Sequence, residues 1–211
     1  MSLIRYYGVN RPVDLLLLFL KDYDLTTYEH SLRVGELAEK TARGLHLSEE
    51  YVRRIKIGAL LHDIGKLKVP KNILNKTDSL TDHEKQIITN HPLDGVSFLQ
   101  FCADPIILNC VMYHHEKING KGYPYGYEGK MIPLEAKIVA ACDVFDALIS
   151  DRPYQEAISY DETKFIMSDF VMKGSLDVKI VDVLLSTYER EHFIIPSPVQ
   201  EQEEYILEND F

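Results

Sequence analysis

Hydrophobic residues recur along this chain at the spacing of a helix. Apolar side chains follow one another at intervals of three and four residues, as at Val34, Leu37 and Ala38 on one side of a segment that also carries His30 and Thr41, and this period is typical of an amphipathic helix. We find neither sustained apolar-polar alternation nor paired runs joined by Asn-Gly or Asp-Gly, which would indicate strands and hairpins. The pattern predicts an all-α domain.

Local signals divide this pattern into separate helices. Pro12 suits the first turn of an apolar helix over residues 12–22, which we interpret as packing on the core, with a dimer seam as the alternative. The predicted caps are Thr26 with Glu29, Ser48, Thr81 with Glu84, Asp104, Ser159 with Glu162, and Ser175. The corresponding helices should end near Gly44, Gly65, His91, the stretch His114-His-Glu116 and residue 190, with further helices from Leu93 and from Leu134 to Ser150.

Composition places the chain among globular proteins. Of 211 residues, 45% are hydrophobic and 27% charged, which is usual for one folded domain. The longest apolar run, Leu15 to Leu20, is far shorter than the roughly 20 residues of a membrane span, and no signal peptide precedes it. Cys102, Cys110 and Cys142 form no C-x-x-C pair, which indicates free thiols. We expect a cytoplasmic protein without membrane insertion.

The charge balance narrows the choice of partners. A net charge of -10 disfavours binding to a nucleic-acid polymer, although a local basic pocket could hold a small phosphate ligand. Lys66, Lys68, Lys71 and Lys76 lie in a stretch that contains no acid. We interpret them as solvated loop lysines, with substrate recruitment as the alternative. Residues 199–211 carry only acidic charges and are predicted to be a mobile end.

Two features point to a functional site. Residues 117–133 hold four of the eleven glycines, with tyrosines alternating among them, and so long a loop is uncommon without a function. Five histidines and two acids also fall at the ends or inner faces of predicted helices. They are His30, His62, Asp63, His91, His114, His115 and Asp143.

A shared cation explains these seven residues best. A lone histidine is usually a satisfied core side chain, and we interpret His46, His83 and His192 in that way. Burying several imidazoles and carboxylates together is costly unless a divalent ion compensates them. Adjacent His62 and Asp63 suit a dinuclear site, because a carboxylate has two oxygens to share. Nitrogen and oxygen ligands permit iron, manganese, zinc, cobalt or nickel.

Paired cations favour chemistry at phosphorus. Two ions about 3.5 to 4 Å apart can clamp a phosphodiester and stabilise its attacking and departing oxygens. Lys66 follows Asp63 by three residues and could neutralise a phosphate oxygen. Asp146, in the same apolar segment as Asp143, also needs a partner if it is buried.

The chain resembles a known family at these residues. His62-Asp-Ile-Gly-Lys66 and His114-His-Glu-Lys-Ile-Asn-Gly-Lys-Gly-Tyr-Pro124, followed by Asp143-Val-Phe-Asp-Ala-Leu148 and Asp151-Arg-Pro-Tyr154, resemble the HD-GYP subgroup of HD-domain phosphohydrolases. The resemblance covers about residues 24–190. It implies an all-α HD-domain bundle, with a five-helix core and additional helices, flanked by an N-terminal helix within residues 1–23 and an acidic tail over residues 191–211.

The resemblance also implies an activity and a set of roles. The activity is hydrolysis of cyclic di-GMP to pGpG or GMP at a buried di- or trinuclear metal centre. The family's metal positions fall on the seven residues above, with Asp63 bridging, and iron or manganese is favoured. Lys66 and Arg152 match phosphate contacts. Tyr123 matches the residue that lines the guanine pocket or holds the shape of the loop.

Three departures from the family pattern qualify these expectations. Thr26 stands where members with a third metal carry Glu, so we expect two ions. Asn119 replaces an acid in the loop, and Gln155 replaces a basic residue. Two alternatives to a cyclic di-GMP phosphodiesterase follow: a phosphohydrolase of another cyclic dinucleotide, or a weakly active module that binds cyclic di-GMP or a GGDEF-domain partner through residues 117–133.

Overall fold

The computed structural model of the chain describes residues 11–100, 104–151 and 157–193. Within these ranges every regular element is helical, and the closest approach to a strand is a single bridge between Asn119 and Glu128. The all-α prediction is confirmed. None of the helices in these ranges is long and apolar enough to cross a lipid bilayer.

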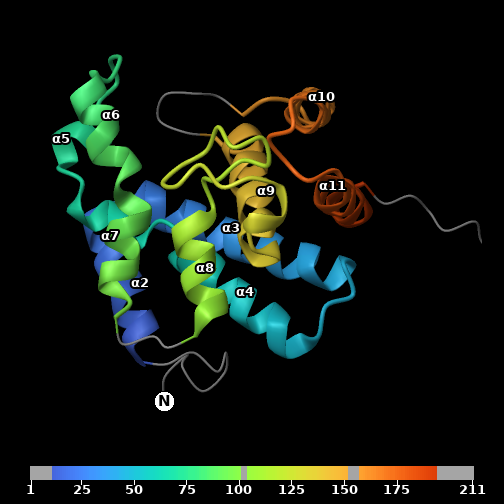
Figure 1. The fold of residues 1–211 in the computed structure, drawn as a ribbon, viewed down its shortest axis with the longest axis horizontal. Coiled ribbons are helices and arrows are strands. Elements are labelled where there is room, and N and C mark those ends of the chain that lie inside the picture. Colours follow the sequence, from blue (N-terminus) through green and yellow to red (C-terminus); the bar gives the residue numbers. More distant parts are fainter. Residues whose placement is uncertain (1–10, 101–103, 152–156, 194–211) are drawn as a thin grey trace, which may run out of the picture.

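The helices form a central group with others on both sides (Figure 1). In Figure 1, α3, α4, α8 and α9 lie in the middle, α2 and α5 to α7 on one side, and α10 and α11 on the other. In chain order they are α2 (Arg11–Tyr23), α3 (Leu25–Gly44), α4 (Glu49–Leu61), η1 (Ile64–Lys68), α5 (Lys71–Leu74), α6 (Asp82–Thr89), α7 (His91–Phe98), α8 (Pro105–Tyr113), η2 (Gly129–Met131), α9 (Leu134–Ile149), α10 (Tyr160–Met172) and α11 (Val178–His192).

Two hydrophobic clusters hold these helices together. The larger joins α3, α4 and α9 to α10 and α11 and includes the fully buried Phe145 and Ile55. The smaller contains Val13 of α2 and Leu61 of α4, so α2 packs on the core along one side. Leu15, Leu18 and Phe19 of α2 remain exposed.

Most predicted helix starts are confirmed. Ser48 accepts a hydrogen bond from the Tyr51 N–H at the start of α4, and Asp104 caps α8. Thr81 and Ser159 each form a complete capping box with the glutamate three residues later. These four signals are local, because the side chain satisfies N–H groups within its own first turn.

Two predicted caps are wrong. Asp24, not Thr26, caps α3: its backbone is extended and its carboxylate accepts from the Thr27 N–H at 2.8 Å. Thr26 therefore lies inside the first turn. Asp177, not Ser175, caps α11, because the Ser175 N–H still bonds to the Phe170 carbonyl at the end of α10.

Two predicted helix boundaries also move. The helix expected to stop near Gly65 ends at Leu61, and after a turn the chain tightens into the 3₁₀-helix η1. The helix expected from Leu93 begins at His91. Pro92 is tolerated there because a proline in the first turn has no intrahelical hydrogen bond to lose.

Candidate metal centre

The structure brings all seven predicted metal ligands together. They come from α3, the turn after α4, the start of α7, the end of α8, and α9, and they form two neighbouring groups in each of which one donor atom per residue lies within 4.8 Å of the others. The first ligand group is His30, His62 and Asp143. The second ligand group is Asp63, His91, His114 and His115.

A close backbone approach joins the two halves of the second ligand group. Gly65 follows Asp63 in η1, and a Cβ atom there would lie 1.9 Å from the His91 carbonyl oxygen. Any larger residue would push η1 away from α7. The approach leaves His91 Nε2 3.3 Å from Asp63 Oδ1.

Backbone carbonyls orient three of the histidines. The Nδ1 atoms of His62, His91 and His114 lie 2.7 Å, 2.7 Å and 3.0 Å from the carbonyl oxygens of the residues three positions earlier. A carbonyl only accepts, so each Nδ1 donates and each neutral ring keeps an unprotonated Nε2. This arrangement is typical of histidines prepared to bind a metal.

The inward-facing atoms lack partners of their own. His62 Nε2 and Asp63 Oδ1 are buried without a hydrogen bond. His91 Nε2 and His114 Nε2 lie 3.1 Å apart, and with both Nδ1 atoms donating, two lone pairs face each other. Such buried acceptors are costly unless something satisfies them. A cation does so for all of them, so the residues present fit a metal centre.

Asp63 faces both ligand groups. Its Oδ1 points to His91, while its Oδ2 lies 3.4 Å from His62 Nε2 and 3.8 Å from His30 Nε2. Lys66 Nζ donates to the same Oδ2 at 2.7 Å. This geometry agrees with the predicted bridging role, which stays a prediction.

Protonation states are set by burial and by the neighbouring charges. Burial lowers the pKa of His91 to about 4 and of His115 to about 3, so both rings are neutral at pH 7. Burial alone would raise the pKa of Asp63, but Lys66 and His62 hold it well below its usual value. The second ligand group thus offers neutral imidazoles and an ionised carboxylate.

His30 differs from the other ligands. Burial works to lower its pKa, but hydrogen bonds to Asp143 and Asp146 outweigh burial and raise the pKa to about 9. Its Nε2 lies 3.0 Å from Asp143 Oδ1 and its Nδ1 2.6 Å from Asp146 Oδ2. Without a metal, His30 is therefore an imidazolium between two carboxylates at pH 7.

The segment 117–133 is held against the second ligand group. The buried Glu116 carboxylate accepts from the backbone N–H groups of Tyr125 and Tyr127 at 2.7 Å and 2.9 Å. A Cβ atom on Gly122 would lie 2.5 Å from the His115 carbonyl oxygen. The Tyr123 ring stacks on His115 with 4.6 Å between ring centroids. Sequence reasoning missed Glu116, although its position directly after the histidine pair was a usable signal.

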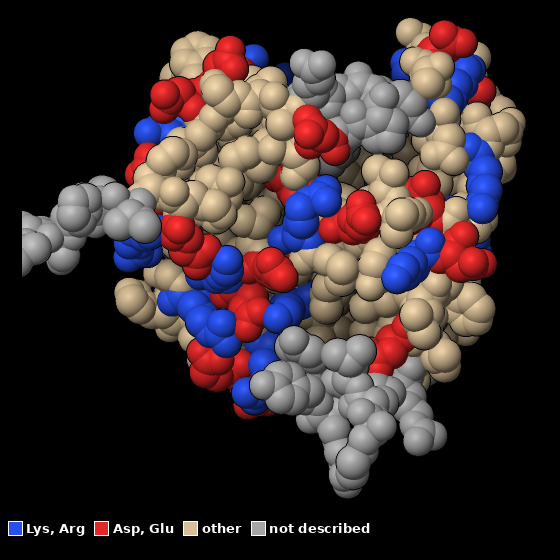
Figure 2. Space-filling view, turned by 180° about the vertical axis from the view of Figure 1, so that it is seen from behind, with Lys and Arg blue, Asp and Glu red and all other residues tan. Residues whose placement is uncertain are grey.

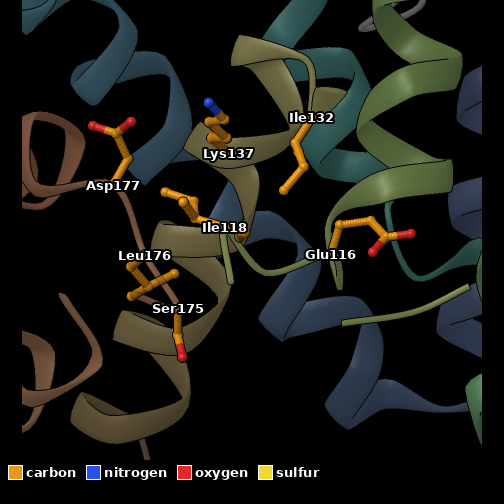
Figure 3. A pocket seen from close by; sticks show the side chains of 8 residues that line it. Glu116, Ile118, Ile132, Lys137, Ser175, Leu176 and Asp177 are labelled. Carbon is orange, nitrogen blue, oxygen red and sulfur yellow. The ribbon is translucent and has the colours of Figure 1, made fainter. Parts of the chain in front are cut away.

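A small pocket lies on another side of the same segment (Figure 3). It is lined by residues that include Ile118, Ile132, Lys137 and Leu176. None of the seven predicted ligands lines it, so this pocket is separate from the candidate metal centre.

The lysines at positions 66–76 are mostly paired with acids. Lys66 bonds Asp63, and two other elements supply acids to this stretch: Asp94 of α7 contacts Lys68 at 2.8 Å, and Glu84 of α6 contacts Lys76 at 2.7 Å. Figure 2, which views the molecule from behind, shows the same mixing of charge on that side, with basic side chains lying beside acidic ones. Lys68 and Lys71 are exposed, as the interpretation as solvated lysines expects, and the acids that pair with Lys68 and Lys76 come from distant sequence.

The three histidines outside the predicted ligand set lie on the surface. His46, His83 and His192 are exposed, so their interpretation as core side chains is wrong; they lie in a turn after α3, the first turn of α6 and the last turn of α11. Arg152, Gln155, Cys102 and the acidic residues 199–211 lie outside the described residues, and the predictions about them stay predictions.

Comparison with known proteins identifies the family. The family model described as "HD domain" matches residues 16–179. The chain belongs to the HD-domain family. The resemblance recognised in the sequence is thereby confirmed.

Curated relatives of the HD-domain chain include phosphodiesterases of cyclic dinucleotides. It is 43% identical over 144 residues to "Cyclic di-GMP phosphodiesterase PA4108" of Pseudomonas aeruginosa, covering 67% of this chain and 35% of that protein. It is 37% identical over 160 residues to "3'3'-cGAMP-specific phosphodiesterase 1" of Vibrio cholerae, covering 75% and 37%. The HD-domain chain thus spans little more than a third of the length of these relatives.

Solved structures show the same fold. Bd1817 of Bdellovibrio bacteriovorus, described as an HDG"Y"P protein, matches with a TM-score of 0.63 at 26% identity and covers 76% of this chain and 51% of its own. The PgpH HD domain of Listeria monocytogenes, solved with cyclic-di-AMP, matches with a TM-score of 0.61 at 23% identity and covers 84% and 97%. At that identity the second match supports the HD-domain fold alone.

Proposed function

We propose that this HD-domain chain is a metal-dependent phosphodiesterase that hydrolyses cyclic di-GMP to pGpG, GMP or both. The observation that carries the proposal is the convergence of seven imidazole and carboxylate ligands, some of them buried without partners, in two adjoining groups. The relatives named cyclic di-GMP phosphodiesterases support the substrate class.

The two ligand groups suit one divalent ion each, with Asp63 shared between them. When bound, the ions supply positive charge that polarises the phosphodiester and lowers the pKa of water. Iron and manganese are the expected metals, and zinc, cobalt or nickel are compatible with the same nitrogen and oxygen atoms.

Residues of the chain then position the substrate. Lys66, whose ammonium group reaches the centre beside Asp63, places one positive charge where a phosphate oxygen would approach. Tyr123, stacked on His115, covers one side of the second ligand group and could contact a guanine. Arg152 is proposed as a second phosphate contact.

Metal loading followed by product analysis tests this function. The chain should be prepared without chelator, loaded with Fe²⁺ or Mn²⁺ under anaerobic conditions, analysed for metal per chain and incubated with cyclic di-GMP. We expect two ions per chain and formation of pGpG or GMP. Full metal loading without either product would refute the proposal.

A second candidate substrate is another cyclic dinucleotide. It is favoured by the 37% identical relative named for 3'3'-cGAMP and by Gln155 in place of a basic residue. Parallel assays with cyclic di-GMP, 3'3'-cGAMP and cyclic di-AMP at equal concentration distinguish the two by the ratio of their kcat/KM values.

Two partner hypotheses accompany the enzymatic one. A GGDEF-domain protein could bind the segment 117–133, and a homodimer could form through the exposed side of α2. Pull-down with a GGDEF domain and sedimentation of the purified chain test them separately from catalysis.

A further inference from the structure

One buried carboxylate beside the metal centre has every acceptor position occupied. Asp146 of α9 is 1% exposed. Its Oδ2 accepts from His30 Nδ1 at 2.6 Å and from Arg33 Nη2 at 3.1 Å, and its Oδ1 accepts from Arg33 Nε at 2.7 Å and from Ser150 Oγ at 3.0 Å. The apolar surroundings of Asp146 in the sequence predict that it needs a partner, but nothing in the sequence indicates Arg33.

We propose that Asp146 and Arg33 are positioning residues that prepare His30 as a ligand of the first ligand group. The proposal rests on the proposed metal-dependent function. It adds that a histidine of the first ligand group takes its orientation from side chains outside the ligand set, whereas His91 and His114 of the second ligand group take theirs from backbone carbonyls.

The two ring nitrogens of His30 have different partners. An ionised carboxylate accepts hydrogen bonds and cannot donate them, so Asp146 requires a proton on Nδ1. Nε2, which lies 3.0 Å from Asp143 Oδ1, is then the atom left for an ion. His62, His91 and His114 obtain the same orientation from backbone carbonyls, which no substitution removes. His30 depends on a side chain, which a substitution can change.

Arg33 fixes the carboxylate itself. It lies three residues after His30 on α3 and reaches Asp146 on α9 with two nitrogens, and such a planar fork holds both the position and the plane of a carboxylate. Its side chain is 40% exposed, so replacing it need not open a cavity. A lysine at this position could contact one oxygen only.

The two metal positions should therefore respond differently to a substitution of Asp146. Asp146→Asn nearly preserves the shape of the side chain but puts an NH₂ group where one oxygen accepted. If that group faces His30, Nδ1 becomes the acceptor and the proton moves to Nε2, which can then no longer bind an ion. If it faces Arg33 Nε, two donors oppose each other. The contacts of the second ligand group are untouched in both cases.

Metal stoichiometry and affinity test the proposal without relying on activity. Wild type, Asp146→Asn, Arg33→Met and Arg33→Lys should be titrated with Mn²⁺ in competition with a chelating indicator and analysed for metal per chain. Arg54→Met is the matched control, because Arg54 has a similarly exposed side chain, 41%, and pairs with Glu50 and Asp104 away from the ligands.

We expect wild type and Arg54→Met to bind two ions. Asp146→Asn and Arg33→Met should lower the affinity for one of the two ions by about 10- to 100-fold, which is the usual effect of removing an orienting contact. The affinity for the other ion should stay within a factor of about two of the wild-type value. Arg33→Lys should recover part of the loss.

Three results would overturn the proposal. Two ions bound with wild-type affinity in Asp146→Asn and Arg33→Met would show that His30 needs no such support. An equal loss of affinity for both ions, or no difference between Arg33→Lys and Arg33→Met, would indicate that these residues support the structure in general and not His30 in particular. In each case a wild type that binds two ions leaves the proposed function standing. A wild type that binds no ion contradicts both the proposed function and the positioning role of Asp146 and Arg33.

Discussion

The protonation of His30 makes the stability of the metal-free HD-domain chain depend on pH. Despite burial, which acts to lower it, the pKa of His30 is raised from 6.5 to about 9 by Asp143 and Asp146. A histidine with a raised pKa in the folded state stabilises that state fully below the unfolded pKa of 6.5, and the contribution disappears as the pH rises through 9. Stability should therefore fall between pH 6.5 and pH 9.

The size of this effect follows from the two pKa values. Linkage gives a His30 contribution of about 3 kcal/mol at pH 6.5 and about 1.4 kcal/mol at pH 8, a loss of roughly 1.6 kcal/mol. The lowered pKa values of His91, His114 and His115 oppose this loss, because each of these rings costs about 0.4 kcal/mol at pH 6.5 and almost nothing at pH 8, so the net loss in wild type is about 0.4 kcal/mol. Cysteine thiols in the unfolded chain ionise near pH 8.5, so measurements should stop at about pH 8.

Urea unfolding of chelator-treated protein at four pH values from 6.5 to 8 measures this loss. His30→Gln should make the free energy of unfolding rise by about 1.2 kcal/mol from pH 6.5 to pH 8, whereas the exposed His192→Gln should behave as wild type. In saturating Mn²⁺ the trend should reverse, because the ion binds only after His30 releases a proton. An equal pH slope in metal-free wild type and in His30→Gln would refute the assigned protonation state of His30.

Three substitutions test other parts of the site. Asp63→Ala should remove both ions, since its two oxygens face both ligand groups, and elemental analysis showing even one retained ion would contradict bridging. Lys66→Ala should keep both ions yet lower kcat by about 10²-fold; unchanged turnover would reject its role. Asn119→Asp should lower the free energy of unfolding by about 1 to 2 kcal/mol, because the amide donates to the Lys173 carbonyl at 2.8 Å and a carboxylate cannot; an unchanged urea midpoint would contradict this.

Sequence signals predicted helices well where one short segment decides the outcome. The capping boxes at Thr81 and Ser159 need only residues of their own first turn, and both are present. The start of α3 was mispredicted because Asp24 and Thr26 are both good capping residues, and the choice depends on where the backbone first becomes helical. Asp24 is extended, with ψ 105°, and Leu25 already belongs to the helix.

Contacts between distant elements could not be predicted in the same way. Nothing local distinguishes Arg33 from the other arginines, since its partner Asp146 lies 113 residues away. The pairing of Lys68 with Asp94 could not be predicted for the same reason, because the partner lies on another element of the chain. His192 was interpreted as a core side chain but is exposed, because a histidine in a helix does not by itself reveal which side of the helix is covered.

The predicted ligands could be picked out from the sequence because most of them lie at the ends of helices. His62 and His114 directly follow α4 and α8, and His91 comes two residues after α6 ends. The last carbonyls of a helix lack intrahelical donors, and each of these histidines donates Nδ1 to one of them. The same hydrogen bond thus adds a donor at the helix end and fixes the tautomer that leaves Nε2 unprotonated. His30 lies inside α3, where the carbonyls are already engaged, so its orientation must come from another helix. Asp146 supplies it, and this explains why a buried carboxylate that need not bind an ion is placed beside the first ligand group.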